Sequence, residues 1–255
     1  MTALTMAAAG SAGAQQAKTG FLDRSVRVGG ATYAYKVYVP PGFAASRSWP
    51  VILYLHGAGE SGTDGVQQTE VGLGPVLRAH PERFPAVVVF PQAPRGQVWM
   101  GDMARAATEA LAEAVKEFHG DPDRVSLAGL SMGAYGAWVE AFAHPERYAA
   151  IVSVAGGIVP PPGWRGRLAE VPPALQADDP YGATAARVKD IPAWLFHGAL
   201  DGTVPVTESR QIVAALKKVG ASPRYTEYEG VGHNSWDRAF AEPELAQWLL
   251  AQRRH

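Results

Sequence analysis

The sequence predicts an α/β fold in which a mostly parallel central sheet is covered by helices on both faces. Short, continuous apolar runs are typical of strands buried on both faces, and here they alternate with amphipathic stretches of helical length. The chain has 255 residues, of which 47% are hydrophobic, enough for one well-buried domain. We therefore expect residues 21–255 to form a single domain.

The composition argues against several classes of partner. The formal net charge is −1 and no run of basic residues occurs, so the sequence lacks the positive surface that nucleic-acid or anionic-membrane binding requires. No apolar stretch is long enough to span a bilayer. The absence of cysteine excludes disulfides and thiolate chemistry. The sequence leaves the oligomeric state open.

The first twenty residues are rich in Ala, Gly and Gln. Ala12-Gly13-Ala14 fits a small-residue cleavage site, which favours a processed signal and a secreted or periplasmic protein. Residues 1–9, however, are short, weakly apolar and free of Lys and Arg. A disordered tail on a cytoplasmic protein is therefore the alternative, and in both cases we expect residues 1–20 to lie outside the fold.

The first half of the domain predicts a hairpin and two buried strands. Residues 25–29 and 32–39 alternate in polarity around Gly29-Gly30, a pattern typical of a two-residue antiparallel hairpin. Residues 51–55 form a continuous apolar run that ends at His56. The polar, Gly-rich residues 60–75 predict an exposed loop, followed by a helix to about Ala79. The next buried strand is residues 86–90.

The second half continues the alternation. Apolar residues recur at helical spacing between residues 102 and 119, with charged residues on the other face. The proline-rich residues 156–190 predict a small cap segment over the site. The other expected elements are strands at 124–130, 151–154, 191–196 and 224–228, and helices at 134–141, 205–219 and 242–252.

Two six-residue stretches, 79–84 and 143–148, are almost identical. Each comes directly before an expected strand, and Pro commonly follows a helix end. We interpret them as two copies of one connection, in which His80 and His144 end helices, and not as a repeat architecture.

A strand, a sharp turn and a helix follow one another from Arg124 to Trp138. Gly129-Leu130-Ser131-Met132-Gly133 lies at the turn and has the pattern of a nucleophile elbow, which exposes a serine hydroxyl above the edge of a sheet. The glycines are needed because a Cβ there would collide with the adjoining strand and helix. The bare pattern also fits an ordinary strand-to-helix turn. Its apolar flanks favour the catalytic interpretation.

A serine hydroxyl needs a base, and the base needs a group that orients it. Asp201 follows one buried strand and His233 lies in a Gly-bounded loop after another, so the chain order is Ser, Asp, His. Asp201 could instead cap the following helix, although Thr203 offers the same function. His233 could instead be a solvated loop histidine.

Two backbone groups are candidates to stabilise an oxyanion. Fixed N–H groups stabilise the negative charge that develops in acyl transfer, and the elbow supplies that of Met132 while the loop after residues 51–55 supplies that of Ala58. His56 and His197 also end strands, which raises a metal site with Ser131 as an alternative. Their spacing does not resemble that of zinc ligands, so we expect no metal and no cofactor.

The chain resembles the α/β-hydrolase superfamily through four motifs in the correct order, HGAGESG, GLSMGAYG, HGALDGTVP and GVGH. The resemblance covers residues 25–252 and extends to small esterases related to feruloyl esterases, dienelactone hydrolases and the catalytic domain of prolyl oligopeptidases. It implies that Ser131 is the nucleophile, His233 the general base and acid, and Asp201 its orienting group, with Ala58 and Met132 in the oxyanion hole. Dienelactone hydrolases use a cysteine nucleophile, which this chain lacks.

The resemblance predicts a cofactor-free carboxylic ester hydrolase acting through an acyl-enzyme on small esters. A prolyl oligopeptidase-like serine peptidase and an acyltransferase are alternatives, although the chain has no room for the gating propeller of those peptidases. A non-hydrolytic binding scaffold is a further alternative, disfavoured by the intact set of catalytic residue types. Short-chain, feruloyl or other aryl esters and polyester fragments are the expected substrates. The candidate substrate-binding aromatics are Trp99, Trp164, Tyr181 and Trp236.

Overall fold

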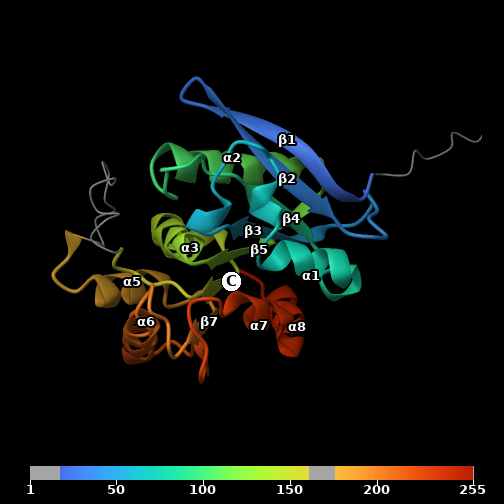
Figure 1. Ribbon diagram of the computed structural model, residues 1–255. Helices are drawn as coiled ribbons and strands as arrows, with labels where there is room; N and C mark the ends of the chain where they lie inside the picture. Colours follow the sequence, from blue (N-terminus) through green and yellow to red (C-terminus); the bar gives the residue numbers. More distant parts are fainter. Residues whose placement is uncertain (1–17, 161–175, 255) are drawn as a thin grey trace, which may run out of the picture.

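The computed structural model describes residues 18–160 and 176–254. These residues form an eight-stranded sheet in the order β1-β2-β4-β3-β5-β6-β7-β8 (Figure 1). β1 and β2 pair antiparallel, β2 pairs antiparallel with β4, and the remaining neighbours are parallel. The strands are β1 (Gly20–Val28), β2 (Ala31–Val39), β3 (Trp49–Leu55), β4 (Val87–Pro91), β5 (Gly120–Leu130), β6 (Ala150–Val154), β7 (Ala193–Gly198) and β8 (Arg224–Tyr228).

Helices cover both faces of the sheet, as the sequence predicts for an α/β-hydrolase fold (Figure 1). One apolar cluster joins the sheet to α2 (Asp102–Glu117), α3 (Met132–Ala143), α5 (Pro180–Val188) and α6 (Thr207–Lys218). A second cluster on the opposite face joins it to α1 (Leu73–Ala79), α7 (Trp236–Ala241) and α8 (Pro243–Ala251). Among the helices of these two described stretches, none combines the length and apolar character needed to cross a membrane.

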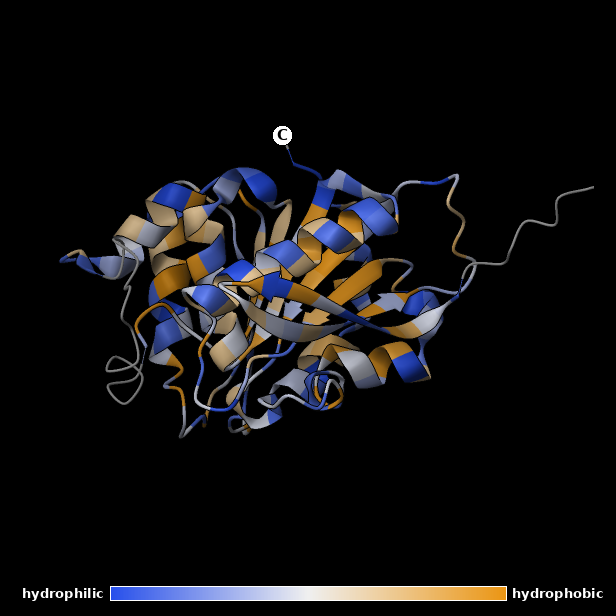
Figure 2. Cartoon of the chain, turned by 90° about the horizontal axis from the view of Figure 1, so that it is seen from above, coloured by the Kyte–Doolittle hydropathy of each residue, from blue (hydrophilic) through white to orange (hydrophobic). Residues whose placement is uncertain are grey.

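The central strands carry the core. Every residue of β3, β4, β6 and β7 is buried, because a parallel sheet covered on both faces leaves neither face to solvent. Figure 2 shows mostly hydrophobic central strands between helices that mix hydrophilic and hydrophobic residues. This rigid interior holds the loops at the carboxyl ends of the strands in fixed positions.

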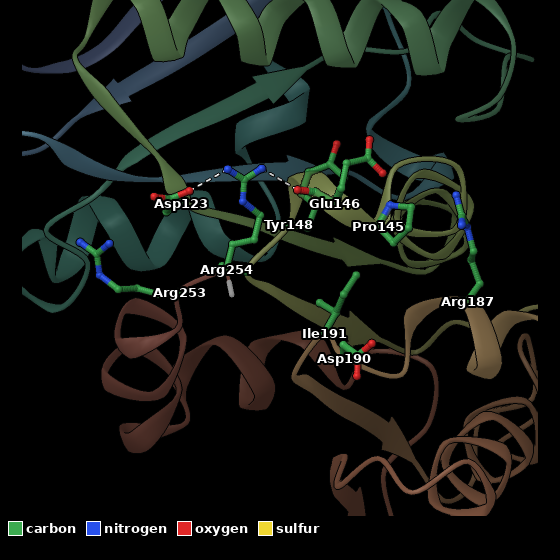
Figure 3. Close-up of a pocket in the computed structure, with 10 residues that line it drawn as sticks. Asp123, Pro145, Glu146, Tyr148, Arg187, Asp190, Ile191, Arg253 and Arg254 are labelled. Carbon is green, nitrogen blue, oxygen red and sulfur yellow. Dashed lines mark hydrogen bonds and ion pairs between the residues drawn. The ribbon is translucent and has the colours of Figure 1, made fainter.

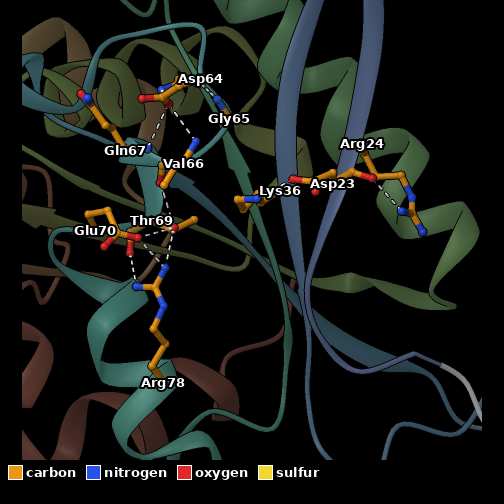
Figure 4. A network of polar contacts seen from close by, with 11 residues as sticks. Asp23, Arg24, Lys36, Asp64, Gly65, Val66, Gln67, Thr69, Glu70 and Arg78 are labelled. Carbon is orange, nitrogen blue, oxygen red and sulfur yellow. Dashed lines mark hydrogen bonds and ion pairs between the residues drawn. The ribbon is translucent and has the colours of Figure 1, made fainter.

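The N-terminal hairpin is confirmed. Gly29 and Gly30 have φ of 56° and 85°, a left-handed conformation that glycine adopts without steric cost and that this turn requires. The register pairs Val28 with Ala31 and continues to Gly20 opposite Val39. Asp23 and Lys36 lie opposite each other and form an ion pair across the two strands (Figure 4).

The loop at residues 60–75 is less exposed than predicted. A 3-10 turn, Ala58–Glu60, leads into it and a second, Gln67–Thr69, lies within it, where Gln68 and Thr69 are fully buried. Asp64 Oδ1 accepts hydrogen bonds from two backbone N–H groups of the loop, and the Arg78 guanidinium donates to the Thr69 carbonyl at 2.7 Å (Figure 4). These polar contacts fold part of a Gly-rich stretch onto the protein, so the predicted exposed loop is exposed only in part, for example at Asp64 and Val66.

The segment predicted as a cap is in part a helix of the main layer. Within residues 156–190, α5 packs against α3 and α6 on one face of the sheet. Asp179 caps α5 by accepting from Gly182 N at 2.9 Å, and Pro180 is its first residue. An aspartate followed by proline is a helix-start signal, and the sequence interpretation passed over it. Residues 161–175 lie outside the described residues.

His80 and His144 end helices, as the two similar stretches predict. Their backbone N–H groups donate to Val76 O at 2.8 Å and to Glu140 O at 2.9 Å. Each is followed by a short 3-10 turn that begins with proline. The similarity is therefore one connection used twice.

Candidate active site

The turn between β5 and α3 holds Ser131 in a strained conformation. Its φ of 49° and ψ of −118° lie outside the regions that residues with a side chain commonly occupy. The backbone N–H of Ser131 donates to Val154 O at 2.8 Å, which fixes the turn against β6. A Cβ on Gly129 would overlap Gly133 O, and one on Gly133 would overlap Leu55 O. The turn can therefore form only with glycine at both positions.

Three polar side chains from separate loops form one hydrogen-bonded row. Ser131 Oγ lies 3.0 Å from His233 Nε2, and His233 Nδ1 lies 2.7 Å from Asp201 Oδ2. Ser131 follows β5, Asp201 follows β7 and His233 follows β8. The carboxyl ends of parallel strands meet at one edge of the sheet, so residues 102 positions apart in sequence become neighbours.

The Asp201 carboxylate is completely buried and held by several donors. Its Oδ1 accepts from the backbone N–H groups of Thr203 and Val204, each at 2.8 Å. Burial by itself would raise the pKa of Asp201, but hydrogen bonds from His197, His233 and these two N–H groups hold it well below its ordinary value. Asp201 is thus an anion held in one position. Its hydrogen bonds to Thr203 N and Val204 N lie within its own loop, and it does not cap α6.

The row determines how the histidine protons are placed. A carboxylate only accepts hydrogen bonds, so the proton on His233 Nδ1 is assigned by its contact with Asp201. His233 Nε2 is then free to accept the proton of the Ser131 hydroxyl. This is the tautomer that a general base for a serine nucleophile needs.

The loop after β3 passes beside Ser131. A Cβ built on Gly57 would lie 3.5 Å from the Ser131 Cβ, so this loop adjoins Ser131 one residue before Ala58, which is exposed. Met132 is the first residue of α3, where a backbone N–H has no acceptor within the helix. Both N–H groups proposed for an oxyanion hole thus belong to segments next to Ser131.

Trp99 supports this loop from the core and does not line a cleft. Its ring is 3% exposed, and Nε1 donates to His56 O at 3.0 Å. A buried indole needs an acceptor for its N–H, and the carbonyl just beyond β3 supplies it. The interpretation of Trp99 as a substrate-binding residue is therefore corrected: it packs edge-on against the His56 ring.

His56 is a neutral structural residue. Its Nε2 accepts from Ala93 N at 3.0 Å, and its Nδ1 lies 2.6 Å from Gly57 O. Burial lowers the pKa of His56 to about 4. Both ring nitrogens are thus occupied by the protein backbone. Across the residues that the structure describes, His, Asp and Glu side chains do not gather in threes as metal ligands do.

The remaining predicted aromatics lie at different places. The Trp236 ring, at the start of α7, stands edge-to-face against the His233 imidazole at 5.2 Å between centroids. Tyr181, at the start of α5, donates its hydroxyl to Glu208 at 2.7 Å. Trp164 lies outside the described residues. Of the predicted aromatics that the structure describes, Trp236 therefore makes the direct contact with the hydrogen-bonded row of Ser131, His233 and Asp201.

A separate pocket of about 630 Å³ lies at the opposite ends of the parallel strands (Figure 3). Its lining includes Tyr148 and Ile191, which come just before β6 and β7. Arg254 crosses it and binds Asp123 at 2.7 Å. The length of β5 separates this pocket from Ser131, so it is not part of the site.

One residue near the site was not assigned a role from the sequence. His197, the penultimate residue of β7, has Nε2 3.2 Å from Asp201 Oδ2. The sequence signal is its position four residues before Asp201 in HGALD, whereas the sequence alone suggests His197 only in the alternative of a metal site. The structure places its ring against Asp201, on the oxygen that also contacts His233.

Comparisons with known proteins point to one family. The family described as "Putative esterase" matches residues 27–248. "Putative esterase NocK" from Nocardia uniformis subsp. tsuyamanensis is 32% identical over 152 residues, which are 54% of this chain and 42% of that protein. An "Uncharacterized secreted protein" from Arthroderma benhamiae is 27% identical over 204 residues, 74% of this chain and 22% of that protein.

Solved structures show the same fold. A thermostable esterase superposes with a TM-score of 0.78 at 30% identity, over 92% of this chain and 63% of that one. A ferulic acid esterase superposes with a TM-score of 0.71 at 17% identity, over 90% of this chain and 96% of that one. The chain thus spans less than half the length of the two curated relatives and about two thirds of the thermostable esterase.

Proposed function

Because the chain belongs to the esterase family, we propose that it is a serine carboxylic ester hydrolase that works through an acyl-enzyme. The observation that carries the proposal is the row in which Ser131 Oγ, His233 and Asp201 are linked at 3.0 and 2.7 Å. A hydroxyl, an imidazole and a buried carboxylate hydrogen-bonded in this order are the groups of a serine nucleophile, its general base and the group that orients the base.

Acylation begins when Ser131 Oγ attacks the ester carbonyl carbon and its proton passes to His233 Nε2. The carbonyl oxygen becomes an oxyanion, which accepts hydrogen bonds from the N–H groups of Ala58 and Met132. Asp201 stabilises the imidazolium that forms at His233. The intermediate then collapses, the ester C–O bond breaks, and His233 donates the proton to the departing alcohol.

Deacylation repeats these steps with water. His233 Nε2 takes a proton from a water molecule, which attacks the acyl carbon held on Ser131 Oγ. The second oxyanion forms in the same place, and its collapse releases the carboxylic acid and returns the proton to Ser131. Every proton in the cycle thus passes through one nitrogen of His233.

The proposed substrates are short-chain or aryl esters, including feruloyl esters and polyester fragments. An alkoxide or phenoxide leaves more readily than an amine, so esters make smaller demands on His233 as an acid. Trp236 offers an aromatic edge beside His233, and offset or edge contacts with an aryl acyl group add to binding. Tyr181 and Trp164 remain candidates for the same role. The signal-like residues 1–20 and the secreted relative support export of the protein.

A fluorophosphonate probe tests the nucleophile. The wild-type protein is expected to take up one probe per chain at Ser131, and Ser131→Ala is expected to fold normally, lose nearly all ester turnover and remain unlabelled. Mass spectrometry of the labelled peptide gives the site. Labelling that persists in Ser131→Ala would remove Ser131 as the nucleophile.

A substrate comparison tests the reaction class. We expect kcat/KM for p-nitrophenyl butyrate and methyl ferulate to exceed that for a prolyl p-nitroanilide by about a hundredfold, because amine expulsion needs protonation in a well-aligned geometry. All three are measured on one preparation. An anilide rate equal to the ester rates would replace the esterase proposal with the peptidase alternative.

A further inference from the structure

Two imidazoles converge on a single oxygen of Asp201. Oδ2 lies 2.7 Å from His233 Nδ1 and 3.2 Å from His197 Nε2, while Oδ1 is satisfied by backbone N–H groups. The catalytic mechanism uses the first of these imidazoles. The second is completely buried and has no part in the proton transfers.

The partners of His197 fix its proton. Nε2 lies 3.0 Å from the Val204 carbonyl as well as near Asp201 Oδ2, and both oxygens can only accept. Nε2 therefore carries a hydrogen, which it shares between them. Nδ1 lies 2.7 Å from Ser209 Oγ, a hydroxyl on α6 that can donate to it or accept from it. The ring is thus held at both nitrogens.

The other carboxylates near His197, on β8 and α6, are bound by other side chains. Glu227 is its register partner on β8, and the Glu227 carboxylate is bound by Arg210 at 2.6 Å. Glu208 on α6 accepts from the Tyr181 hydroxyl at 2.7 Å. Asp201 is left as the anion that His197 contacts directly.

Backbone hydrogen bonds just beyond the end of β7 join the loop of Asp201 to the loop of His233. Ala199 N donates to Tyr228 O at 3.0 Å, and Leu200 N donates to Val231 O at 2.9 Å. His197 lies just before this junction. A side chain here that is fixed at both ring nitrogens therefore sets where the Asp201 carboxylate sits relative to His233.

We propose that His197 is a positioning residue for the catalytic row: its Nε2–H orients Asp201 Oδ2 toward His233 and withdraws part of the negative charge from that oxygen. The inference rests on the proposed role of Asp201 as the partner of His233. Two consequences follow. Losing the N–H lets the carboxylate turn, which lowers kcat more than it raises KM. It also leaves more negative charge facing the His233 imidazolium, which moves the acid limb of the pH–rate profile to higher pH.

Two substitutions that differ by one methylene separate positioning from packing. His197→Gln can place an amide N–H where Nε2 lies, whereas His197→Asn is too short to reach Asp201 but still offers a polar group to Ser209. We expect His197→Asn to lower kcat about tenfold or more, with KM within about threefold and the acid limb displaced upward. His197→Gln is expected to recover most of kcat and the wild-type acid limb.

Ser153→Ala is the matched control. Ser153 is fully buried on β6 and its Oγ accepts from Trp138 Nε1 at 3.0 Å, away from Asp201. This variant removes a buried polar contact and is expected to leave kcat and the acid limb unchanged. A folded His197→Asn protein with wild-type kcat and acid limb, or a His197→Gln protein no better than His197→Asn, would overturn the proposal.

A spectroscopic readout separates this inference from the proposed esterase activity. In ¹⁵N-labelled protein the His233 Nδ1–H resonance reports its hydrogen bond to Asp201 without any turnover. It is expected to move downfield in His197→Asn and to return in His197→Gln. If substitutions at residue 197 do not fold, Ser209→Ala loosens the same ring and is expected to move the resonance in the same direction. A His233 Nδ1–H resonance that does not move in the variants would overturn the positioning role, even if the wild-type enzyme is active. If the wild-type protein hydrolyses no ester but the resonance moves in His197→Asn, only the esterase proposal is overturned.

Discussion

The loop that carries His233 passes very close to Gly198, the last residue of β7. A Cβ built on Gly198 would lie 2.9 Å from Val231 C and still closer to the carbonyl oxygens of Val231 and Gly232. These are backbone atoms, so no side-chain rotation can relieve the overlap. Gly198→Ala therefore requires the loop itself to move.

The size of the movement follows from contact distances. Ordinary contacts begin near 3.4 Å, so the loop has to retreat by roughly 1 Å to accept the methyl group. Gly232 directly precedes His233, and His233 Nε2 starts 3.0 Å from Ser131 Oγ. A misplacement of about 1 Å between reacting groups costs about a hundredfold in rate. We expect kcat/KM to fall by that factor while the fold is retained.

The assay is hydrolysis of p-nitrophenyl butyrate, with circular dichroism and thermal melting to check folding. Gly202→Ala is the matched control, because it is the same chemical change four residues further along the chain, where a Cβ meets nothing within 4 Å. We expect that variant to keep activity within about threefold of wild type. A folded Gly198→Ala enzyme with wild-type kcat/KM would refute the close-approach argument.

Two further substitutions test buried carboxyl groups. Asp201→Asn is expected to lower kcat about 10⁴-fold, because the amide favours the wrong tautomer of His233; a loss below tenfold in the same ester assay would contradict this. Glu140→Gln is expected to raise the melting temperature at pH 7 and to have little effect at pH 4. Burial raises the pKa of Glu140, although the hydrogen bond from Tyr148 opposes the shift. The stability that the protonated Glu140 provides is therefore present below its ordinary pKa and is lost as pH rises through its raised pKa in the folded protein. Equal changes in melting temperature at both pH values would argue against this account.

Features with local determinants were readable from the sequence. The hairpin depends on two adjacent glycines that adopt positive φ, and the elbow depends on glycines two residues on either side of Ser131. The alternation of apolar runs and amphipathic stretches determined the sheet and its two helical layers. Each of these signals lies within a few residues of the structure that it specifies.

The sequence also indicated which loops carry the candidate site. Ser131, Asp201 and His233 each follow an apolar run, and parallel strands place their carboxyl ends at one edge. The order of the strands in the sheet and the distances of 3.0 and 2.7 Å came only from the folded chain.

Tertiary packing decided the burial of individual side chains. Gln68 lies in a Gly-rich, polar stretch and is nevertheless fully buried, while Trp99 enters the core because His56 O, 43 residues away, accepts its N–H. His197 gained its contact with Asp201 because β7 ends beside both loops. Local sequence sets backbone preferences, but the partners of a buried polar group come from distant parts of the chain, and only the fold brings them together.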